Sequence, residues 1–437
     1  MTTDASSAVL TPTSGQPGPV DQSTRREILV YVGILMALTG YCTPQGGLIY
    51  IPVSFILKNK LHLSAHEVAE FRLWTALPFY YAFLFGFTRD AFINKGIGDR
   101  GLLLVFGICG TLIYSSFAFL PFGYWTLVLS FVLLAVSYLM IASAVRGLAS
   151  VFGQRQLISG QVSTVWTLVT LLPSFTAVLG GGALSQLLEG ENTDRAVRVV
   201  FLIGAGIMAA IAVVGASWPR MKCEEPQTPT LRGGLKLAGL IRLRPIYPVL
   251  LISLLWYFMP GTGTPLQFYF QNSLYGNDAQ WGVWNAIADV SNIPALFIFG
   301  YLCRRVALRE LLFWGTIIGI PQTLPLLFMH SVTGGLVAAV PFGFTSAIAT
   351  AAYLDLVIRI CPRGMQGTVL MAFYCLENFA SRFGDVLGTR MFDYWGGFRV
   401  CVAATMVTTA LIIPLLFLIP KELVAVPDQS GLEKQYS

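Results

Sequence analysis

The chain has 437 residues, of which 55% are hydrophobic and 11% are charged, and its formal net charge is +6. A soluble globular protein carries roughly 25% charged residues, so this chain has too few to cover a surface in water, which excludes an ordinary soluble domain. Its basic residues form no cluster with aromatic residues of the kind that binds nucleic acid, and we expect no nucleic-acid partner.

The chain begins with a polar stretch and continues as a series of apolar runs. Residues 1–27 are rich in Ser, Thr, Pro and Gly, which predicts a disordered cytoplasmic tail. Each later run has about 20 residues and can cross a hydrocarbon core of about 30 Å. The predicted spans are residues 28–56, 66–87, 101–119, 125–145, 158–182, 199–218, 247–270, 280–302, 311–329, 336–358, 368–388 and 400–420.

The longest polar interruption, residues 219–246, follows the sixth span and divides the spans into two sets of six. We therefore predict an all-α membrane protein whose twelve transmembrane helices form two pseudo-symmetric six-helix bundles, residues 28–218 and 247–420. Residues 231–243 of the cytoplasmic linker have the pattern of an amphipathic interfacial helix. Residues 421–437 would form a second cytoplasmic tail.

Basic residues are distributed unequally between the two sides of the predicted membrane. Of the 28, we assign twenty to the side of the first tail, including Arg146 after span four and Arg359 after span ten. Six lie on the opposite side, and Arg72 and Arg382 lie within spans. The positive-inside rule then predicts a multi-pass protein of the plasma (cell inner) membrane with both termini in the cytoplasm.

Markers repeat between the two halves at a nearly constant spacing. They are a helix-start box, a glycine at a helix end and an arginine after a span, and the two members of each pair are 213 or 214 residues apart. The pairs are Ser64 with Asn277, Gly86 with Gly300, and Arg146 with Arg359. This agreement favours an internal repeat.

Pro and Gly interrupt the first span of each half, at residues 43–47 and 260–265. Such breaks free backbone groups that lipid cannot satisfy, so they should face a cavity or a neighbouring helix. Paired interruptions are typical of a binding site between two repeats. Alternatively, they only bend the helices for packing.

Two spans carry polar faces deep in the membrane. Span eight has Asn285, Asp289 and Asn292 at i, i+4 and i+7, which is one helical face. Span eleven has the most polar transmembrane face of the sequence. Its polar residues are Tyr374, Glu377, Asn378, Ser381, Arg382 and Asp385. Tyr41 and Gln45, beside the break in span one, are further candidates for binding, although such groups also serve as interhelical hydrogen-bond donors.

The intramembrane carboxylates allow two interpretations. A charge at mid-bilayer costs roughly 2.5 to 3.5 kcal/mol, so Asp289 and Glu377 should be paired, protonated or facing water. One of them could bind and release a proton during turnover. Alternatively, they form fixed ion pairs with Arg382 and Arg72 that hold helices together. Arg382 could also pair with Asp385 or with an anionic substrate.

Two stretches of the sequence resemble a known family. They contain Leu57-Lys58, Leu61-His62-Leu63-Ser64, Gly86-Phe87-Thr88-Arg89-Asp90, Asp99-Arg100 and Cys361-Pro362-Arg363-Gly364-Met365-Gln366-Gly367-Thr368. These motifs are similar to the folate-biopterin transporter family within the major facilitator superfamily. The chain departs from that family at Ala82-Phe83, where a Lys-Pro pair is common, and at Gln366, where an acidic residue is common. Muropeptide-permease-like carriers of the same superfamily share similar features.

The resemblance implies a secondary active transporter that moves a small organic solute, such as a pterin or folate, by alternating access and with proton coupling. A muropeptide-permease-like or drug-efflux carrier is the alternative. In major facilitators the aspartate equivalent to Asp90 latches the outward-facing form by bonding a helix end across the two halves. The resemblance therefore makes Asp90, with Arg89 and Arg100, a candidate latch, whereas an ordinary solvated turn is the alternative.

Other functional classes find less support in the sequence. There is no His-Glu-x-x-His motif and no Walker-type loop, so we predict neither an enzyme nor a cofactor or metal site. Asp355 and Asp385 lie at depths that differ by roughly 25 Å and cannot form a protease pair. A non-transporting receptor or scaffold is the rival of another class. The expected partners are a small-molecule substrate, protons and membrane lipid, and we expect a monomer.

Overall fold

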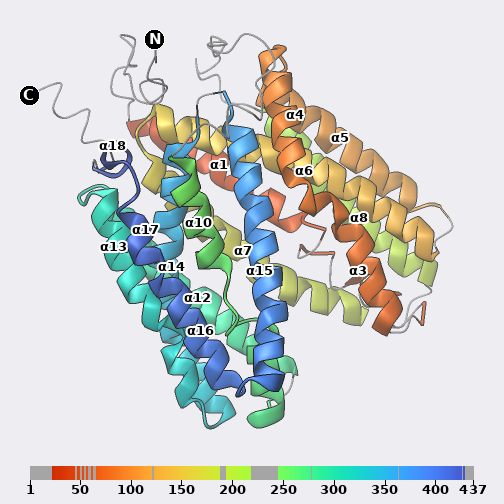
Figure 1. Cartoon of the computed structure of the whole chain (residues 1–437). Helices are drawn as coiled ribbons and strands as arrows, with labels where there is room; N and C mark the ends of the chain where they lie inside the picture. Colours follow the sequence, from red (N-terminus) through yellow and green to blue (C-terminus); the bar gives the residue numbers. More distant parts are fainter. Residues whose placement is uncertain are drawn as a thin grey trace, which may run out of the picture.

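A computed structural model of the chain describes residues 22–44, 47–49, 52–53, 56–57, 61–62, 65–120, 123–187, 193–217, 245–276, 278–362, 364–425 and 427–428. Every regular element in these residues is a helix (Figure 1). The candidate residue Gln45, the helix-start residues Ser64 and Asn277, and the predicted amphipathic helix at 231–243 lie outside the described residues.

The first half contains six helical passes. The first helix begins within the predicted tail, because Gln22 already belongs to it. The second pass is divided at Tyr81 into two helices, three residues after Pro78. The helices are α1 (Gln22–Tyr41), α3 (Ala65–Tyr80), α4 (Ala82–Asn94), α5 (Asp99–Phe117), α6 (Tyr124–Arg155), α7 (Ser159–Leu187) and α8 (Thr193–Ala216).

The second half repeats this arrangement with more irregular helices. Its first pass is divided into three pieces, and its third continues from an α-helix into a 3-10 helix. The elements are α10 (Ile246–Tyr257), α11 (Thr264–Phe268), the π-helix η3 (Tyr269–Ser273), α12 (Asp278–Leu302), α13 (Leu308–Gly319), the 3-10 helix η4 (Ile320–Phe328), α14 (Val332–Ile360), α15 (Gln366–Tyr394), α16 (Phe398–Ala410), α17 (Ile412–Leu416) and α18 (Lys421–Val424).

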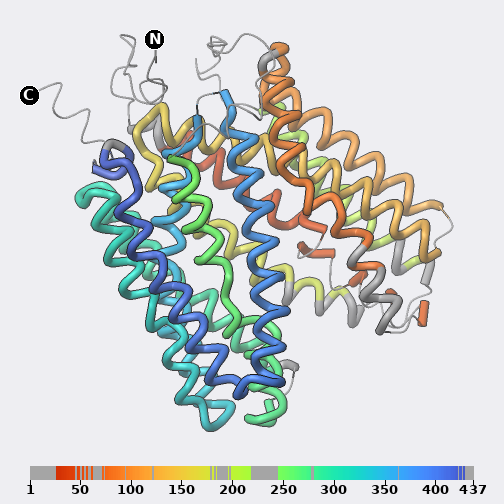
Figure 2. Tube along the Cα trace, viewed as in Figure 1, coloured from red at the N-terminus to blue at the C-terminus, as the bar shows by residue number. Residues whose placement is uncertain are grey.

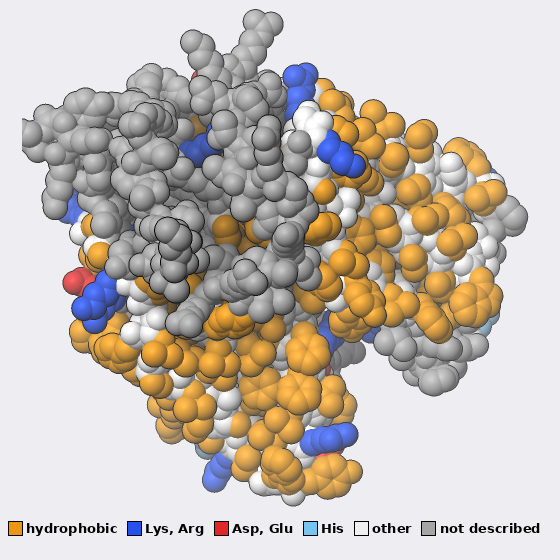
Figure 3. Space-filling view, turned by 45° about the horizontal axis from the view of Figure 1, so that its top comes forward, with side chains coloured by type: hydrophobic (Ala, Val, Ile, Leu, Met, Phe, Trp, Pro, Cys, Tyr) orange, Lys and Arg blue, Asp and Glu red, His pale blue; other side chains and the backbone are white. Residues whose placement is uncertain are grey.

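The helices follow the order of the twelve predicted spans, which confirms the predicted fold class. Seven stretches of the described chain are long and apolar enough by themselves to cross a membrane, and α10 is a shorter apolar helix. The remaining passes are not among these seven stretches because they are interrupted or more polar. The helix α15, for example, carries Glu377, Arg382 and Asp385. Many large apolar side chains are exposed, Leu112 and Val213 among them, and apolar side chains cover much of the described surface on the face seen in Figure 3, as expected of a surface in contact with lipid.

The two halves form two lobes with separate apolar cores. One core is built almost entirely from α1 to α8, and the two others involve mainly α10 to α18. The lobes lie together at the end where α1 begins and α18 lies, and they diverge toward the other end (Figures 1 and 2). We call the first of these the closed end. Figure 3 also shows a notch between the two lobes.

Helices of the two halves cross in two equivalent places. In one, α4 packs along α15, and in the other α12 packs along α7. At the first crossing, Gly86 lies against the backbone of Gly367, where a Cβ atom would not fit. At the second, a Cβ atom on Gly300 would come within 3.0 Å of the Thr164 side chain. Gly86 and Gly300 are one of the pairs of the sequence repeat, and here both meet a helix of the opposite half.

Two arginines that we placed after predicted spans, Arg146 and Arg359, lie within helices. We predicted that span four ends at residue 145 and span ten at residue 358, but α6 continues to Arg155 and α14 to Ile360. The helix of span four therefore extends beyond the predicted end of the span, and Arg146 lies within it. The physical reason is that residues 147–153 are small or apolar and are buried against other helices, so the helix continues past the charge.

Candidate functional site

Arg146 lies between aromatic rings contributed by both halves. It projects from α6, and its guanidinium carbon is 3.9 Å from the ring centre of Tyr374 on α15 and 5.2 Å from that of Trp166 on α7. A guanidinium at these distances from ring faces makes a cation–π interaction, which is stronger away from water. Arg146 therefore joins the two lobes at one point between them.

Glu377 lies one helical turn after Tyr374 on α15 and faces the same region. Its carboxylate accepts a hydrogen bond from the Tyr257 hydroxyl, and the positive charge of Arg146 is close enough to act on it. Tyr257 is the last residue of α10, directly before the break in span seven. The opposite charges of Arg146 and Glu377 lower the free-energy cost of placing each in a membrane.

The break in span one reaches the same region from the first half. The Thr43 hydroxyl donates a hydrogen bond of 3.2 Å to the Tyr138 hydroxyl, and Tyr138 lies within electrostatic reach of Tyr374 and Arg146. Tyr41 makes a hydroxyl–hydroxyl hydrogen bond with Thr176 of α7. Tyr41 therefore ties α1 to α7 within one half.

The predicted polar face of span eight, on α12, makes a hydrogen bond across the two halves through Asp289. The Ser174 hydroxyl of α7 donates a hydrogen bond of 3.0 Å to Asp289. Asn292 accepts a hydrogen bond of 3.4 Å from Ser346 within the second half, and Asn285 donates only to the carbonyl of its own helix at Trp281. Asp289 therefore faces the opposite lobe rather than lipid.

The predicted polar stripe of α15 divides into groups with different surroundings. Asn378 donates to the Tyr374 carbonyl of its own helix, and Arg382 is exposed. Asp385 accepts hydrogen bonds of 2.7 Å from both the backbone amide and the hydroxyl of Thr264. Asp385 therefore caps the start of α11.

The backbone groups freed by the break in span seven are bound by neighbouring helices. Besides the Asp385 cap at Thr264, the amide of Gly261 donates a hydrogen bond of 2.7 Å to the Thr405 hydroxyl of α16. Gly263 has a φ of +64°, which a residue with a side chain rarely adopts. Residues 258–263 are thus a defined bend held by α15 and α16.

At the closed end, Asp90 bonds the first turn of α15. Its carboxylate accepts hydrogen bonds from the amides of Gly367 at 3.1 Å and Thr368 at 2.7 Å, and from the Thr368 hydroxyl at 2.6 Å. Arg89 is 1% exposed and donates to Asp90 at 2.8 Å and to both oxygens of Asp99. A carboxylate stabilises the amides and positive dipole end at a helix N-terminus.

Arg100, the third residue assigned to this latch, does not cross between the halves. Its guanidinium donates a hydrogen bond of 3.1 Å to the carbonyl of Ala216, at the end of α8 in the same lobe. Asp99, rather than Arg100, lies beside Arg89 and accepts its hydrogen bonds. Gln154 adds a second tie, because its side-chain amide donates to the carbonyls of Ile358 at 2.7 Å and Cys361 at 2.6 Å.

Arg146 and Gln154 are not among the candidates from the sequence, and Tyr257 is there only an aromatic residue that could stack on a flat heterocycle, not a partner of Glu377. The signal for Arg146 was present, since the small and apolar residues 147–153 allow span four to continue beyond it. Tyr257 and Gln154 gave no such signal, because each is defined by a partner more than a hundred residues away.

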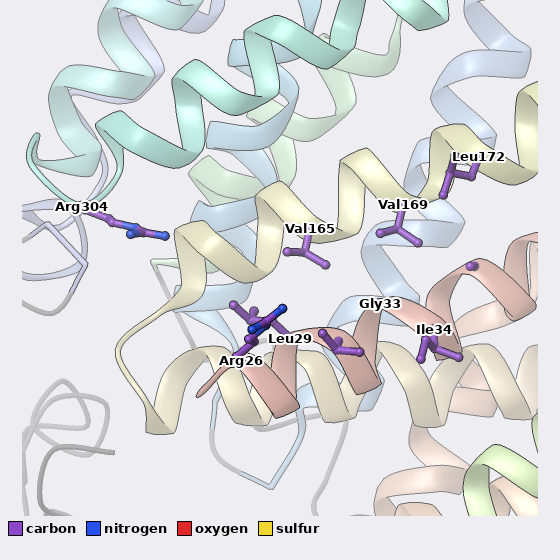
Figure 4. Close-up of a pocket in the computed structure, with 10 residues that line it drawn as sticks. Arg26, Leu29, Gly33, Ile34, Val165, Val169, Leu172 and Arg304 are labelled. Atoms are coloured by element: carbon purple, nitrogen blue, oxygen red, sulfur yellow. The ribbon is translucent and has the colours of Figure 1, made fainter. Parts of the chain in front are cut away.

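A groove on the side of the molecule is separate from these residues. It has a volume of about 650 Å³ and lies between α1 and α7, with an apolar lining that includes Leu29, Ile34 and Val169 (Figure 4). Arg26 and Arg304 also line it. None of the predicted binding residues that the structure describes lines this groove, so it is not the candidate site.

Comparisons with known proteins agree with this architecture. The family model described as Major Facilitator Superfamily matches residues 34–385. The folate-biopterin transporter of Synechocystis sp. is 24% identical over 431 residues, covering 91% of this chain and 84% of that protein. The probable folate-biopterin transporter 4 of Arabidopsis thaliana is 24% identical over 197 residues, covering 40% of each chain.

Solved structures share the fold at low sequence identity. The transporter FucP in the outward conformation superposes with a TM-score of 0.69 at 13% identity, covering 90% of this chain and 98% of that one. The human organic anion transporter MFSD10 gives a TM-score of 0.62 at 12% identity, with 91% and 100% covered. The family match spans most of the chain, and this chain belongs to the major facilitator superfamily of membrane transporters.

Proposed function

We propose that the protein moves a small organic solute across the membrane by alternating access, with residues 28–218 and 247–420 moving as two units joined by 219–246. The observation that carries this proposal is the position of Arg146, which meets Trp166 of its own half and Tyr374 and Glu377 of the other. A group bound at this point contacts both units and can respond to their relative movement. The folate-biopterin relatives make a pterin or folate the first substrate class to test.

The charges around Arg146 suggest how a proton would be coupled to the solute. Glu377 in its charged form neutralises Arg146, and an anionic group of the solute would compete with it for the guanidinium. A proton on Glu377 removes that competition and keeps the site close to electrical neutrality, which matters because uncompensated charge is costly in a membrane. Proton and anion would therefore bind together. Because Glu377 bonds Tyr257, its titration also acts directly beside the bend at 258–263.

At the closed end, we propose that Asp90 holds the two halves together in the state described here. Its hydrogen bonds to Gly367 and Thr368 join α4 to α15 and must break if the halves separate at that end. Arg89 supports the carboxylate from within the same half. If the closed end faces the cytoplasm, the state is outward-facing.

Uptake into proteoliposomes with an imposed pH gradient tests the coupling, after thermal-shift screening against pterins, folates, amino acids and aminosugars has named a ligand. We expect the gradient to drive accumulation by the wild type. Glu377→Gln should bind and exchange the solute but should not accumulate it in response to the gradient. Asp289→Asn is the matched control, because Asp289 is the other carboxylate that faces the opposite half, through its hydrogen bond from Ser174.

Two results would contradict this assignment. Wild-type uptake that is indifferent to the pH gradient would exclude proton coupling. A gradient response that survives in Glu377→Gln and disappears in Asp289→Asn would transfer the coupling role to Asp289. A ligand that binds without any uptake in the wild type would favour a receptor over a transporter.

A further inference from the structure

Asp428 lies beyond the last helix and is buried against a helix of the opposite half. Its carboxyl oxygens accept hydrogen bonds from the backbone amides of Gly160 at 3.4 Å and Gln161 at 3.1 Å, in the first turn of α7. Its own amide donates a bond of 3.0 Å to the carbonyl of Cys303, just after α12. The residue is 4% exposed. A short stretch of the C-terminal tail is thus anchored on the second half and bonds the first.

Arg359 completes this cluster from α14. Its guanidinium binds Asp428 at 3.0 Å and both oxygens of Asp355 at 2.9 and 3.1 Å. It also donates a bond of 3.0 Å to the Ser159 hydroxyl, at the first residue of α7. One arginine between two aspartates therefore faces the start of a helix that belongs to the other half.

The cluster has the same composition and geometry as the one around Asp90. There, Arg89 lies between Asp90 and Asp99, and Asp90 bonds the second and third residues of α15, Gly367 and Thr368. Asp428 likewise bonds the second and third residues of α7. The two clusters close the same end of the molecule at its two equivalent helix crossings.

The clusters differ in where the capping carboxyl group comes from. The spacing of 214 residues that relates Gly86 to Gly300 relates Asp90 to Arg304. An arginine cannot cap a helix N-terminus, because the amides and the dipole there both favour a negative group. The side chain of Arg304 is exposed, and Asp428 from the tail occupies the capping position instead.

We propose that Asp428 takes part in the transport cycle as the counterpart of Asp90: it fastens the closed end by capping α7 and must leave α7 for that end to open. This inference rests on the proposed alternating-access function. Residue 428 lies outside the region matched by the family model, which ends at residue 385. The tail would thereby make opening of this end depend on its own position.

Two native cysteines allow the opening to be measured without a substrate. Cys303 and Cys361 are 1% and 4% exposed at the closed end. The backbone carbonyl of Cys303 accepts a hydrogen bond from the Asp428 amide. The backbone carbonyl of Cys361 accepts one from the Gln154 side chain, so Cys361 reports on a separate tie between the halves. The full chain is reconstituted, treated with a water-soluble maleimide, and analysed by mass spectrometry for alkylation of each cysteine.

In Asp428→Ala we expect both cysteines to be alkylated at least about tenfold faster than in the wild type, because a charge-assisted bond across the interface is lost. Deletion of residues 426–437 should have the same effect and provides a second variant if Asp428→Ala fails to fold. Asp393→Ala is the matched control, since Asp393 is exposed at the far end of α15, and its rates should be unchanged.

Faster alkylation of Cys303 alone would overturn the proposal, because it would mean that the tail loosens without opening the end. Unchanged rates at both cysteines in folded variants would overturn it as well. The readout is independent of transport: if the rates rise as expected but proteoliposomes move no solute, the latch stands and the proposed transport function fails.

Discussion

At the scale of single residues, the candidate site depends on which cation and which carboxylates face one another. Arg146 offers a flat guanidinium to Tyr374 and Trp166, an arrangement that the point charge of lysine would not reproduce. At the closed end, Arg359 is shared between Asp355 and Asp428, so two negative groups compete for one positive group. This imbalance makes Asp428 sensitive to pH.

We predict that docking of Asp428 strengthens as the pH falls. Burial, followed by the negative charge of Asp355, raises the pKa of Asp428 to about 7, although Arg359 and the amides of Gly160 and Gln161 oppose this. Released into water, the carboxyl group would return to its ordinary pKa of about 3.9. The docked form therefore binds the proton more tightly than the released form. The free energy of docking becomes more favourable as the pH falls from about 7 to about 4, and this stabilisation is lost as the pH rises through 7.

Hydrogen exchange measures this effect at the start of α7. After correction for the intrinsic pH dependence of exchange, the segment containing Gly160 and Gln161 should be better protected at pH 6 than at pH 8. Asp428→Ala cannot titrate there and should show no such difference. Greater protection at pH 8, or the same pH response in Asp428→Ala, would contradict the prediction. Cys303 also lies near this carboxyl group, so the comparison should be repeated with Cys303→Ala.

At the scale of elements, the first pass of the second half is a broken helix whose ends are bound by its neighbours. Lipid offers no hydrogen bonds, so each freed backbone group needs a partner in the protein. Around residues 258–263, Asp385 of α15 and Thr405 of α16 supply such partners. The bend is therefore part of the packing and should be lost with its partners.

We expect Asp385→Ala to destabilise the protein by about 2 to 3 kcal/mol, because the amide and the hydroxyl of Thr264 lose a charged acceptor. Thr264→Val removes only the hydroxyl bond and should cost about 1 kcal/mol. The thermal unfolding midpoint in detergent should fall in that order. Asp393→Ala, an exposed change on the same helix, should leave it unchanged. An equal midpoint for Asp385→Ala and Asp393→Ala would show that the cap does not hold the bend.

At the scale of the whole molecule, two lobes meet at one end and diverge at the other (Figure 1). The ties through Asp90, Gln154, Arg359 and Asp428 lie at the closed end. α1 begins at this end and α18 lies there. The excess of basic residues assigned to the side of the tails predicts that the closed end faces the cytoplasm.

A tag attached after residue 437 should therefore be inaccessible to antibody in intact cells and accessible after permeabilisation. A tag inserted between α5 and α6, near residue 120, should react in intact cells and serves as the matched control. Reaction of the C-terminal tag from outside would reverse the orientation and make the described state inward-facing.

The sequence by itself determined the membrane class, the order of the twelve spans, the two halves and the paired breaks. These features follow from local composition, because a chain in lipid must bury its backbone bonds within helices of a fixed minimum length. It also indicated Asp90, through a motif, and the polar faces of α12 and α15, through their periodicity. The helix of span four is longer than the predicted span because residues 147–153, which are small or apolar, are buried and continue the helix past Arg146.

Only the tertiary structure decided which residues meet between the halves. Asp90 bonds Gly367 across 277 positions of the chain, and Asp428 bonds Gln161 across 267. Neither the spacing nor the composition of a segment predicts such pairings, because they depend on the angle and register at which α4 crosses α15 and α12 crosses α7. Glycines at these crossings let the backbones approach closely enough for the carboxyl groups to reach the helix ends. The role of Arg146 was decided in the same way, because its position between Trp166 and Tyr374 exists only when α6, α7 and α15 pack together.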